Sequence, residues 1–151
     1  MPGARGLGAL LVVLALAVAW SASRLPSDAT PSVHAPGAQA YTPDLVAQLR
    51  AEGRPVLINM TADWCITCKV NEKAVLGTTA FQQMLAKTNT AYVVGDWTNE
   101  DPAITEFLQQ WGSPGVPLYV LYPAGSKHGR KLPQLLTEDL LERELTAAAA
   151  K

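Results

Sequence analysis

Cysteine is scarce in this chain of 151 residues, which contains only two, Cys65 and Cys68, in a single Cys-x-x-Cys segment. Two cysteines cannot form the set of disulfides that holds together a small secreted scaffold. An excess of charge is also lacking, because 12 basic residues stand against 13 acidic ones. A net charge of −1 provides no basic surface for nucleic acid, so we expect no nucleic-acid partner.

The chain also lacks an apolar run as long as a membrane-spanning helix usually needs. Leu7 to Trp20 are fourteen uncharged residues, whereas a spanning helix takes about 20. With Arg5 before the run and small residues at 17–19 and 21–23, the pattern is typical of a secretory signal peptide. An uncleaved signal anchor is the alternative. In either case we expect an exported protein, soluble or tethered to a membrane by residues 7–20.

The segment after the apolar run is rich in proline, serine and alanine and poor in large apolar side chains. Such a composition cannot offset the entropy lost on ordering, so we predict a flexible linker. The expected organisation is therefore a signal peptide or anchor over 1–20, a linker over 21–40 and one folded domain over 41–151.

The expected domain alternates segments of helical periodicity with short apolar runs typical of strands. The predicted helices are 43–52, 69–76, a segment that opens at Thr79, 102–111 and a segment from Thr137. The predicted strands are 55–60, 91–97, 116–122 and, more weakly, 130–132. Because about thirty mostly helical residues separate the first two strands, we expect these strands to be parallel neighbours, with the last two forming a hairpin. The order predicts an α/β fold with a central mixed β-sheet flanked by helices.

The Cys-x-x-Cys segment follows the first strand and precedes a helix, an arrangement suited to thiol–disulfide exchange. This chemistry needs one thiolate that attacks a disulfide and a second thiol that resolves the mixed disulfide. A helix N-terminus favours the thiolate form, so we expect Cys65 to be the nucleophile and Cys68 the resolving thiol. We expect no cofactor beyond a redox-active disulfide between these two residues.

Metal binding is the alternative use of the same two cysteines. A zinc site needs two more ligands, and the histidines, His34 and His128, lie in the expected linker and in a turn, so we expect no metal site. Soft sulfur ligands suit Cu(I), which leaves open a copper-binding or copper-tolerance module that uses Met60 as well. Met60, however, belongs to the expected buried strand.

Four blocks of the sequence occur in a characteristic order. They are Thr61–Glu72, Gly95–Asn99 with Asp101–Pro102, Gly115–Tyr122, and Leu132–Thr137. Together they resemble the periplasmic C-terminal domain of the DsbD family of thiol:disulfide interchange proteins, including its copper-sensitivity-suppressor relatives, within the thioredoxin superfamily. The resemblance covers about residues 41–146 and implies a thioredoxin fold for the domain at 41–151.

The resemblance also implies a function and a location. DsbD C-terminal domains are reduced by their membrane domain and in turn reduce other proteins. We therefore expect a periplasmic protein-disulfide reductase, soluble or tethered to the inner membrane, that passes electrons from a membrane donor of DsbD or CcdA type to oxidised substrate proteins. A disulfide oxidant or isomerase stays an alternative, because the Ile66-Thr67 dipeptide between the cysteines does not determine the direction of exchange.

Three residues around the cysteines are assigned to substrate binding by the same resemblance. Trp64 precedes the nucleophile and is expected to form part of the rim around its sulfur. Pro117 resembles the cis-proline that faces the active site in thioredoxin folds. The backbone of Val116, just before this proline, is expected to pair with a bound partner strand.

Two acids tune the thiols in the DsbD family, and only one of their positions is acidic here. Glu72 occupies that position and is expected to take part in catalysis by handling protons. The other position holds Asn59, which cannot take a proton or repel a thiolate. We therefore hypothesise that Glu72 handles the proton alone and that the nucleophilic thiol has a lower pKa than in relatives with both acids. Asp63 and Asp96 are alternative candidates for the missing acid.

Overall fold

The computed structural model describes residues 36–150. The expected signal segment and all but the last residues of the expected linker lie outside this range. Within residues 36–150, no helix has the length and apolar character required to cross a membrane.

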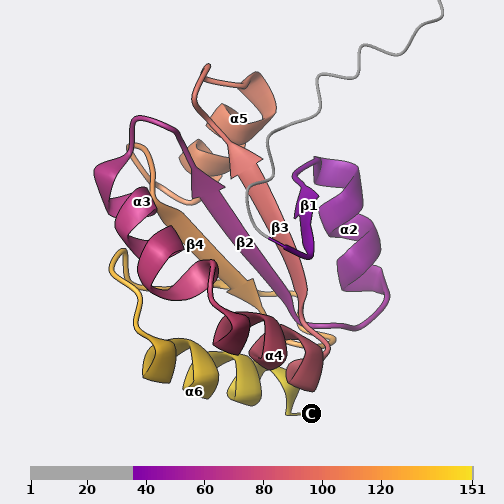
Figure 1. The fold of residues 1–151 in the computed structure, drawn as a ribbon. Helices are drawn as coiled ribbons and strands as arrows, with labels where there is room; N and C mark the ends of the chain where they lie inside the picture. Colours follow the sequence, from indigo (N-terminus) through magenta and orange to yellow (C-terminus); the bar gives the residue numbers. More distant parts are fainter. Residues whose placement is uncertain (1–35, 151) are drawn as a thin grey trace, which may run out of the picture. The chain divides into compact units, whose positions relative to one another are not determined.

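A five-stranded mixed sheet lies at the centre of the domain (Figure 1). Its strands are β1 (Ala38–Ala40), β2 (Val56–Thr61), β3 (Ala91–Asp96), β4 (Leu118–Tyr122) and β5 (Arg130–Lys131), arranged in the order β1-β3-β2-β4-β5. β3 is parallel to both β1 and β2, whereas β4 is antiparallel to β2 and to β5. The parallel pairing of β2 with β3 and the hairpin of β4 with β5 are confirmed.

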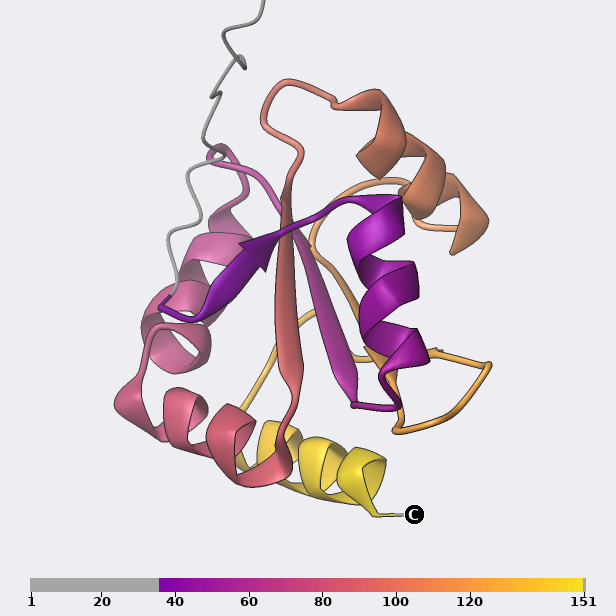
Figure 2. The same cartoon turned by 90° about the vertical axis from the view of Figure 1, so that its right-hand side faces the viewer.

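Helices cover both faces of the sheet, as the edge-on view in Figure 2 shows. α2 (Pro43–Ala51) and α5 (Pro102–Gln110) pack on one face. The other face carries α3 (Ile66–Asn71), the π-helical segment η1 (Glu72–Leu76), α4 (Thr79–Thr88) and α6 (Glu138–Ala149). The sheet therefore separates two apolar cores, and the predicted α/β thioredoxin fold is confirmed.

The alternation of side chains along β2 supplies both cores. Ile58 and Met60 are fully buried in the core under α2 and α5, whereas Leu57 belongs to the core under α3, α4 and α6. Asn59 is polar yet only 2% exposed, and it donates a hydrogen bond to Tyr92, which belongs to the core under α3, α4 and α6. One polar residue thus occupies an otherwise apolar strand, close to the cysteines in sequence.

Helix ends follow from short-range hydrogen bonds. The side chains of Thr42 and Thr137 accept hydrogen bonds from the backbone of the first turns of α2 and α6, as expected of N-caps. α4 begins at Thr79, as predicted, and the side chain of Thr78 is its N-cap. The helix after the cysteines begins at Ile66 rather than at the predicted Lys69, so the first turn contains Cys68.

The boundary of the sheet differs from the prediction at its N-terminal side. Residues 38–40 were expected to be linker, yet they form β1, parallel to β3 with Ala38 opposite Tyr92. The sheet therefore begins before the predicted domain start at residue 41. A strand of three small or polar residues has no apolar alternation, and it forms because the backbone of β3 offers hydrogen-bonding groups at that edge.

Candidate active site

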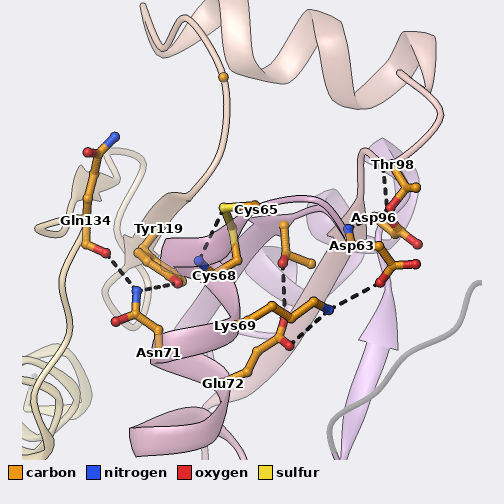
Figure 3. Close-up of a disulfide and its surroundings, with 12 residues drawn as sticks. Asp63, Cys65, Cys68, Lys69, Asn71, Glu72, Asp96, Thr98, Tyr119 and Gln134 are labelled. Carbon is orange, nitrogen blue, oxygen red and sulfur yellow. Dashed lines mark hydrogen bonds and ion pairs between the residues drawn. A yellow bond between two sulfur atoms is a disulfide. The ribbon is translucent and has the colours of Figure 1, made fainter.

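Cys65 and Cys68 form a disulfide where β2 ends and α3 begins (Figure 3). Their Cα atoms are 5.2 Å apart. Cys65 is the N-cap of α3, and its Sγ accepts a hydrogen bond of 3.2 Å from the backbone N–H of Cys68. Cys65 is 5% exposed and Cys68 1% exposed, so Cys65 is the sulfur that a partner reaches first.

The loop before β4 lies against this disulfide. β4 pairs with β2 so that Leu118 is opposite Met60, which brings the preceding residues to the end of β2. The peptide bond between Val116 and Pro117 is cis, as the resemblance implies. Val116 packs against the small buried cluster that contains both cysteines. Two segments about fifty residues apart therefore meet at the sulfur atoms.

Trp64 is held at the rim of the site by the segment that follows β3. Its indole N–H donates a hydrogen bond of 3.3 Å to the backbone oxygen of Thr98, and its ring centroid lies 6.0 Å from that of Trp97. Trp97 is anchored in turn by a 2.8 Å hydrogen bond to Thr105. Trp64 is nevertheless 56% exposed, so it presents an apolar surface beside Cys65. A site role for Trp97 was not predicted, because no local spacing links it to the cysteines.

Glu72 lies one helical turn beyond Cys68, and two side chains hold its carboxylate. Thr61 Oγ1 donates a hydrogen bond of 3.0 Å to Glu72 Oε1, and Lys69 Nζ lies 3.3 Å from Oε2. Among residues 36–150, no hydrogen bond joins the Glu72 carboxylate to either cysteine of the disulfide, although the backbone N–H of Glu72 donates to the backbone oxygen of Cys68. The carboxylate thus lies on the cysteine-bearing side of the fold, oriented by β2 and α3.

Lys69 links Glu72 to a second acid (Figure 3). Its Nζ is 3.2 Å from Asp63 Oδ1, whose side chain is more than half exposed. Burial alone lowers the pKa of Lys69, but the hydrogen bonds to Asp63 and Glu72 outweigh this effect and raise that pKa above its ordinary value. Lys69 therefore stays cationic at neutral pH.

The other candidate for the missing acid, Asp96, belongs to a turn at the end of β3. Its Oδ1 accepts a hydrogen bond of 2.9 Å from Thr98 N and another from Thr98 Oγ1. Asp63 and Asp96 both border the cavity described next, but neither occupies the buried strand position that Asn59 fills.

A cavity of about 340 Å³ extends behind α3. Asn59, Thr61, Glu72 and Tyr92 are among its lining residues. Asn59 Nδ2 donates a hydrogen bond of 2.9 Å to Tyr92 Oη, whereas Asn59 Oδ1 accepts none from any described residue. A cavity of this size has room for water, which can donate to such an oxygen. The buried position near the end of β2 therefore carries a neutral amide rather than an acid.

The residues considered for metal binding do not gather at the cysteines. Within residues 36–150, no cluster of three or more His, Cys, Asp or Glu side chains could hold a metal ion. Met60 is fully buried in the core under α2 and α5, with its sulfur over Gly95. His128 is exposed in the β4–β5 connection, and His34 lies outside the described residues.

The sheet order, the cis-proline and the Cys-x-x-Cys disulfide at the start of a helix together define a thioredoxin-like protein. The family model described as thioredoxin-like matches residues 38–124, more than half of the chain, and the chain belongs to this family. Among curated proteins, it is similar to the thiol:disulfide interchange protein DsbD of Yersinia pestis, at 32% identity over 84 residues. DsbD 1 of Pseudomonas aeruginosa is 34% identical over 80 residues.

These curated relatives are much longer than the matched region. The matches cover 55% and 53% of this chain but only 14% and 13% of the two relatives. Among solved structures, the C-terminal domain of Neisseria meningitidis DsbD in its oxidised form has a TM-score of 0.57 at 22% identity, over 69% of this chain and 92% of that one. A thioredoxin from Thermus thermophilus has a TM-score of 0.56 at 20% identity, over 74% and 86%. The two structures show the shared fold, and the predicted resemblance to DsbD is confirmed.

Proposed function

We propose that this protein is an exported thiol:disulfide interchange protein that reduces the disulfides of substrate proteins through Cys65 and Cys68. The observation that carries the proposal is the nearly buried disulfide at the start of α3, packed against the cis Val116–Pro117 segment. Similarity to DsbD supports the same chemistry. The proposal includes a membrane electron donor of DsbD or CcdA type and a periplasmic location, with the protein either soluble or tethered to the inner membrane by residues 7–20.

The reaction moves two electrons from the protein dithiol to a substrate disulfide. The thiolate of Cys65 attacks one substrate sulfur, which breaks the substrate S–S bond, forms a mixed disulfide and releases the first substrate thiolate. Cys68 then loses its proton and attacks Cys65 Sγ, releasing the second substrate thiolate. Each released thiolate takes a proton, so the products are a Cys65–Cys68 disulfide and two substrate thiols. A donor protein with a reduced dithiol restores the starting state.

Cys65 suits the role of nucleophile because it is the more exposed sulfur and receives the backbone hydrogen bond of Cys68. A hydrogen bond to sulfur favours the thiolate over the thiol. Trp64 directly precedes Cys65, and Val116 packs against the cluster that contains both cysteines. The backbone of Val116, just before the cis-proline Pro117, is our candidate to pair with a substrate strand.

Glu72 is our candidate for the group that takes the proton of Cys68. The two residues are four positions apart on one continuous helical segment, so their side chains share a face. The cavity that Glu72 lines accommodates water, and one water molecule is a sufficient proton carrier between a carboxylate and a thiol. Asn59 has no proton-accepting role in this scheme.

Two measurements on the purified domain test the proposal. First, the reduced protein should convert insulin to its separated chains with dithiothreitol as electron source, whereas Cys65→Ser should not. Second, the reduction potential should lie near that of thioredoxin, about −270 mV. A potential near about −120 mV would identify an oxidant instead. Failure to turn over insulin at all would refute thiol–disulfide exchange with proteins.

A further inference from the structure

One buried amide fastens the cysteine-bearing helix to a loop more than sixty residues away in sequence. Asn71, the last residue of α3, is 1% exposed. Its Nδ2 donates hydrogen bonds of 2.7 Å to the backbone oxygen of Gln134 and 2.9 Å to Tyr119 Oη (Figure 3). Its Oδ1 accepts a hydrogen bond of 3.1 Å from the backbone N–H of Leu136. Both the nitrogen and the oxygen of the Asn71 amide therefore form hydrogen bonds to the backbone of this loop, residues 134–136.

The loop held in this way has buried ends and an exposed tip. Leu132 and Leu136 are 8% and 4% exposed and pack in the core with α4 and α6. Leu135, between the two backbone groups that Asn71 binds, is 62% exposed. The hydrogen bonds of Asn71 thus determine where this leucine stands on the surface.

Large exposed apolar side chains of the described residues gather around the same helix. They are Trp64, Ile66, Val70 and Leu135. Ile66 and Val70 are four residues apart on α3 and share one face, and Trp64 directly precedes Cys65. Large exposed apolar side chains that lie near one another on a surface mark an interaction site.

Exchange chemistry identifies the occupant of this surface. A substrate sulfur has to come within bonding distance of Cys65 Sγ, so the chain that carries it covers the first turn of α3, where Ile66 is 82% exposed. A protein substrate that extends from Cys65 along the helix meets Val70 and then the loop bonded to Asn71. A small disulfide reaches the sulfur without touching either of them.

We propose that Asn71 is a positioning residue that holds Leu135 beside α3, where Leu135, Ile66 and Val70 together bind the apolar segment of a protein substrate during exchange. This inference rests on the proposed function. It assigns to Asn71 and Leu135 a role in choosing protein disulfides over small ones, not a role in the chemistry at sulfur.

The test compares two substrates in single-turnover reactions of the pre-reduced full chain, oxidised insulin and hydroxyethyl disulfide. For Leu135→Ser, the rate constant toward insulin should fall about 5-fold, a typical loss for a contributing interface residue, while that toward hydroxyethyl disulfide stays unchanged. Leu135→Met keeps the apolar surface and should retain the insulin rate. Because the Leu135 side chain is exposed, neither substitution should change the packing of the core.

Asn71→Leu tests the positioning role. It should lower the insulin rate at least as much as Leu135→Ser, and the double variant should be no slower than Asn71→Leu alone, because both act through one contact. Thr88→Val is the matched control, since it removes a buried hydroxyl bonded to Thr90 at the end of α4. This control should leave both rates unchanged.

The outcomes separate the inference from the proposed function. If the unmodified protein reduces neither substrate, the proposed function fails. If it reduces both but Leu135→Ser keeps the insulin rate, or lowers both rates equally, the substrate surface is wrong. Additive losses in the double variant would overturn the positioning role of Asn71.

Discussion

Thr61 Oγ1 donates a hydrogen bond of 3.0 Å to Glu72 Oε1, so a side chain at the end of β2 orients the carboxylate one turn beyond Cys68. Lys69 holds the other carboxylate oxygen from within the same helical segment. The buried strand position two residues before Thr61 carries the amide of Asn59, which cannot take a proton. Proton handling in the proposed exchange therefore depends on one carboxylate and on the groups that orient it.

Asn59→Asp should raise the pKa of the Cys65 thiol in the reduced protein. A second carboxylate near the pair repels the thiolate, and a negative neighbour favours the protonated form. Titration of thiolate absorbance in the ultraviolet measures the change. Asn89→Asp adds the same charge on the exposed end of α4 and should leave the titration unchanged. An unchanged or lower pKa in Asn59→Asp would contradict the hypothesis that the amide lowers the thiol pKa of this chain.

Glu72→Gln should slow the second step of exchange, in which Cys68 attacks the mixed disulfide, by about 10-fold or more, because the amide cannot accept the proton. Thr61→Val removes only the orienting hydrogen bond and should slow this step about 2-fold to 3-fold. In the Glu72→Gln background, Thr61→Val should have no further effect. Rapid-quench measurement of mixed-disulfide decay gives the rates.

Glu106→Gln on α5 is the control for these variants, because it removes an exposed carboxylate on the other side of the sheet. It should behave as the unmodified protein. If Glu72→Gln resolves the mixed disulfide at the normal rate, Glu72 is not the proton acceptor.

Cys68→Ser should accumulate mixed disulfides at Cys65, since the nucleophile is intact and no thiol resolves the intermediate. Cys65→Ser should accumulate far fewer, because Cys68 is almost fully buried. Non-reducing electrophoresis and mass spectrometry of the trapped species in the native host would identify substrate and electron donor together. Equal trapping by both variants would contradict the assignment of Cys65 as nucleophile, and greater trapping by Cys65→Ser would reverse it.

The ionisation of Tyr119 should lower the stability of the disulfide form in alkaline solution. Burial raises the pKa of Tyr119 to about 12, although the hydrogen bond from Asn71 opposes this change. In the unfolded chain this tyrosine ionises near its ordinary pKa of about 10, whereas in the folded protein it ionises only near 12. The contribution of Tyr119 to the free energy of unfolding is therefore fully present below about pH 10 and is lost as the pH rises towards 12.

Urea unfolding of the disulfide form at about pH 9 and about pH 11 checks this effect. Tyr119→Phe should be less stable at both pH values, because it loses the hydrogen bond to Asn71, but its free energy of unfolding should decline less between them. An equal decline in the two proteins would show that ionisation of Tyr119 does not contribute.

Much of the secondary structure was predictable because its signals are local. The threonine caps, the prolines that open α2 and α5 and the apolar runs of β2 and β3 act within a few residues, and the predicted elements agree with the structure within a few positions. β1 was missed because a short strand of small residues depends on the backbone of its neighbour.

The sequence alone determined the Cys-x-x-Cys pair at a helix start, the order of helices and strands, and the neutral Asn59 on a buried strand, because each depends on residue type and near neighbours. The resemblance to DsbD placed Val116 and Pro117 at the active site, but only the tertiary structure decided how distant residues meet there. Pairing of β4 with β2 brings Val116 to the cysteines, and packing of α3 on the sheet brings Glu72 to Thr61 and Asn71 to the loop before α6. Such contacts depend on strand register and helix packing, which no local pattern encodes.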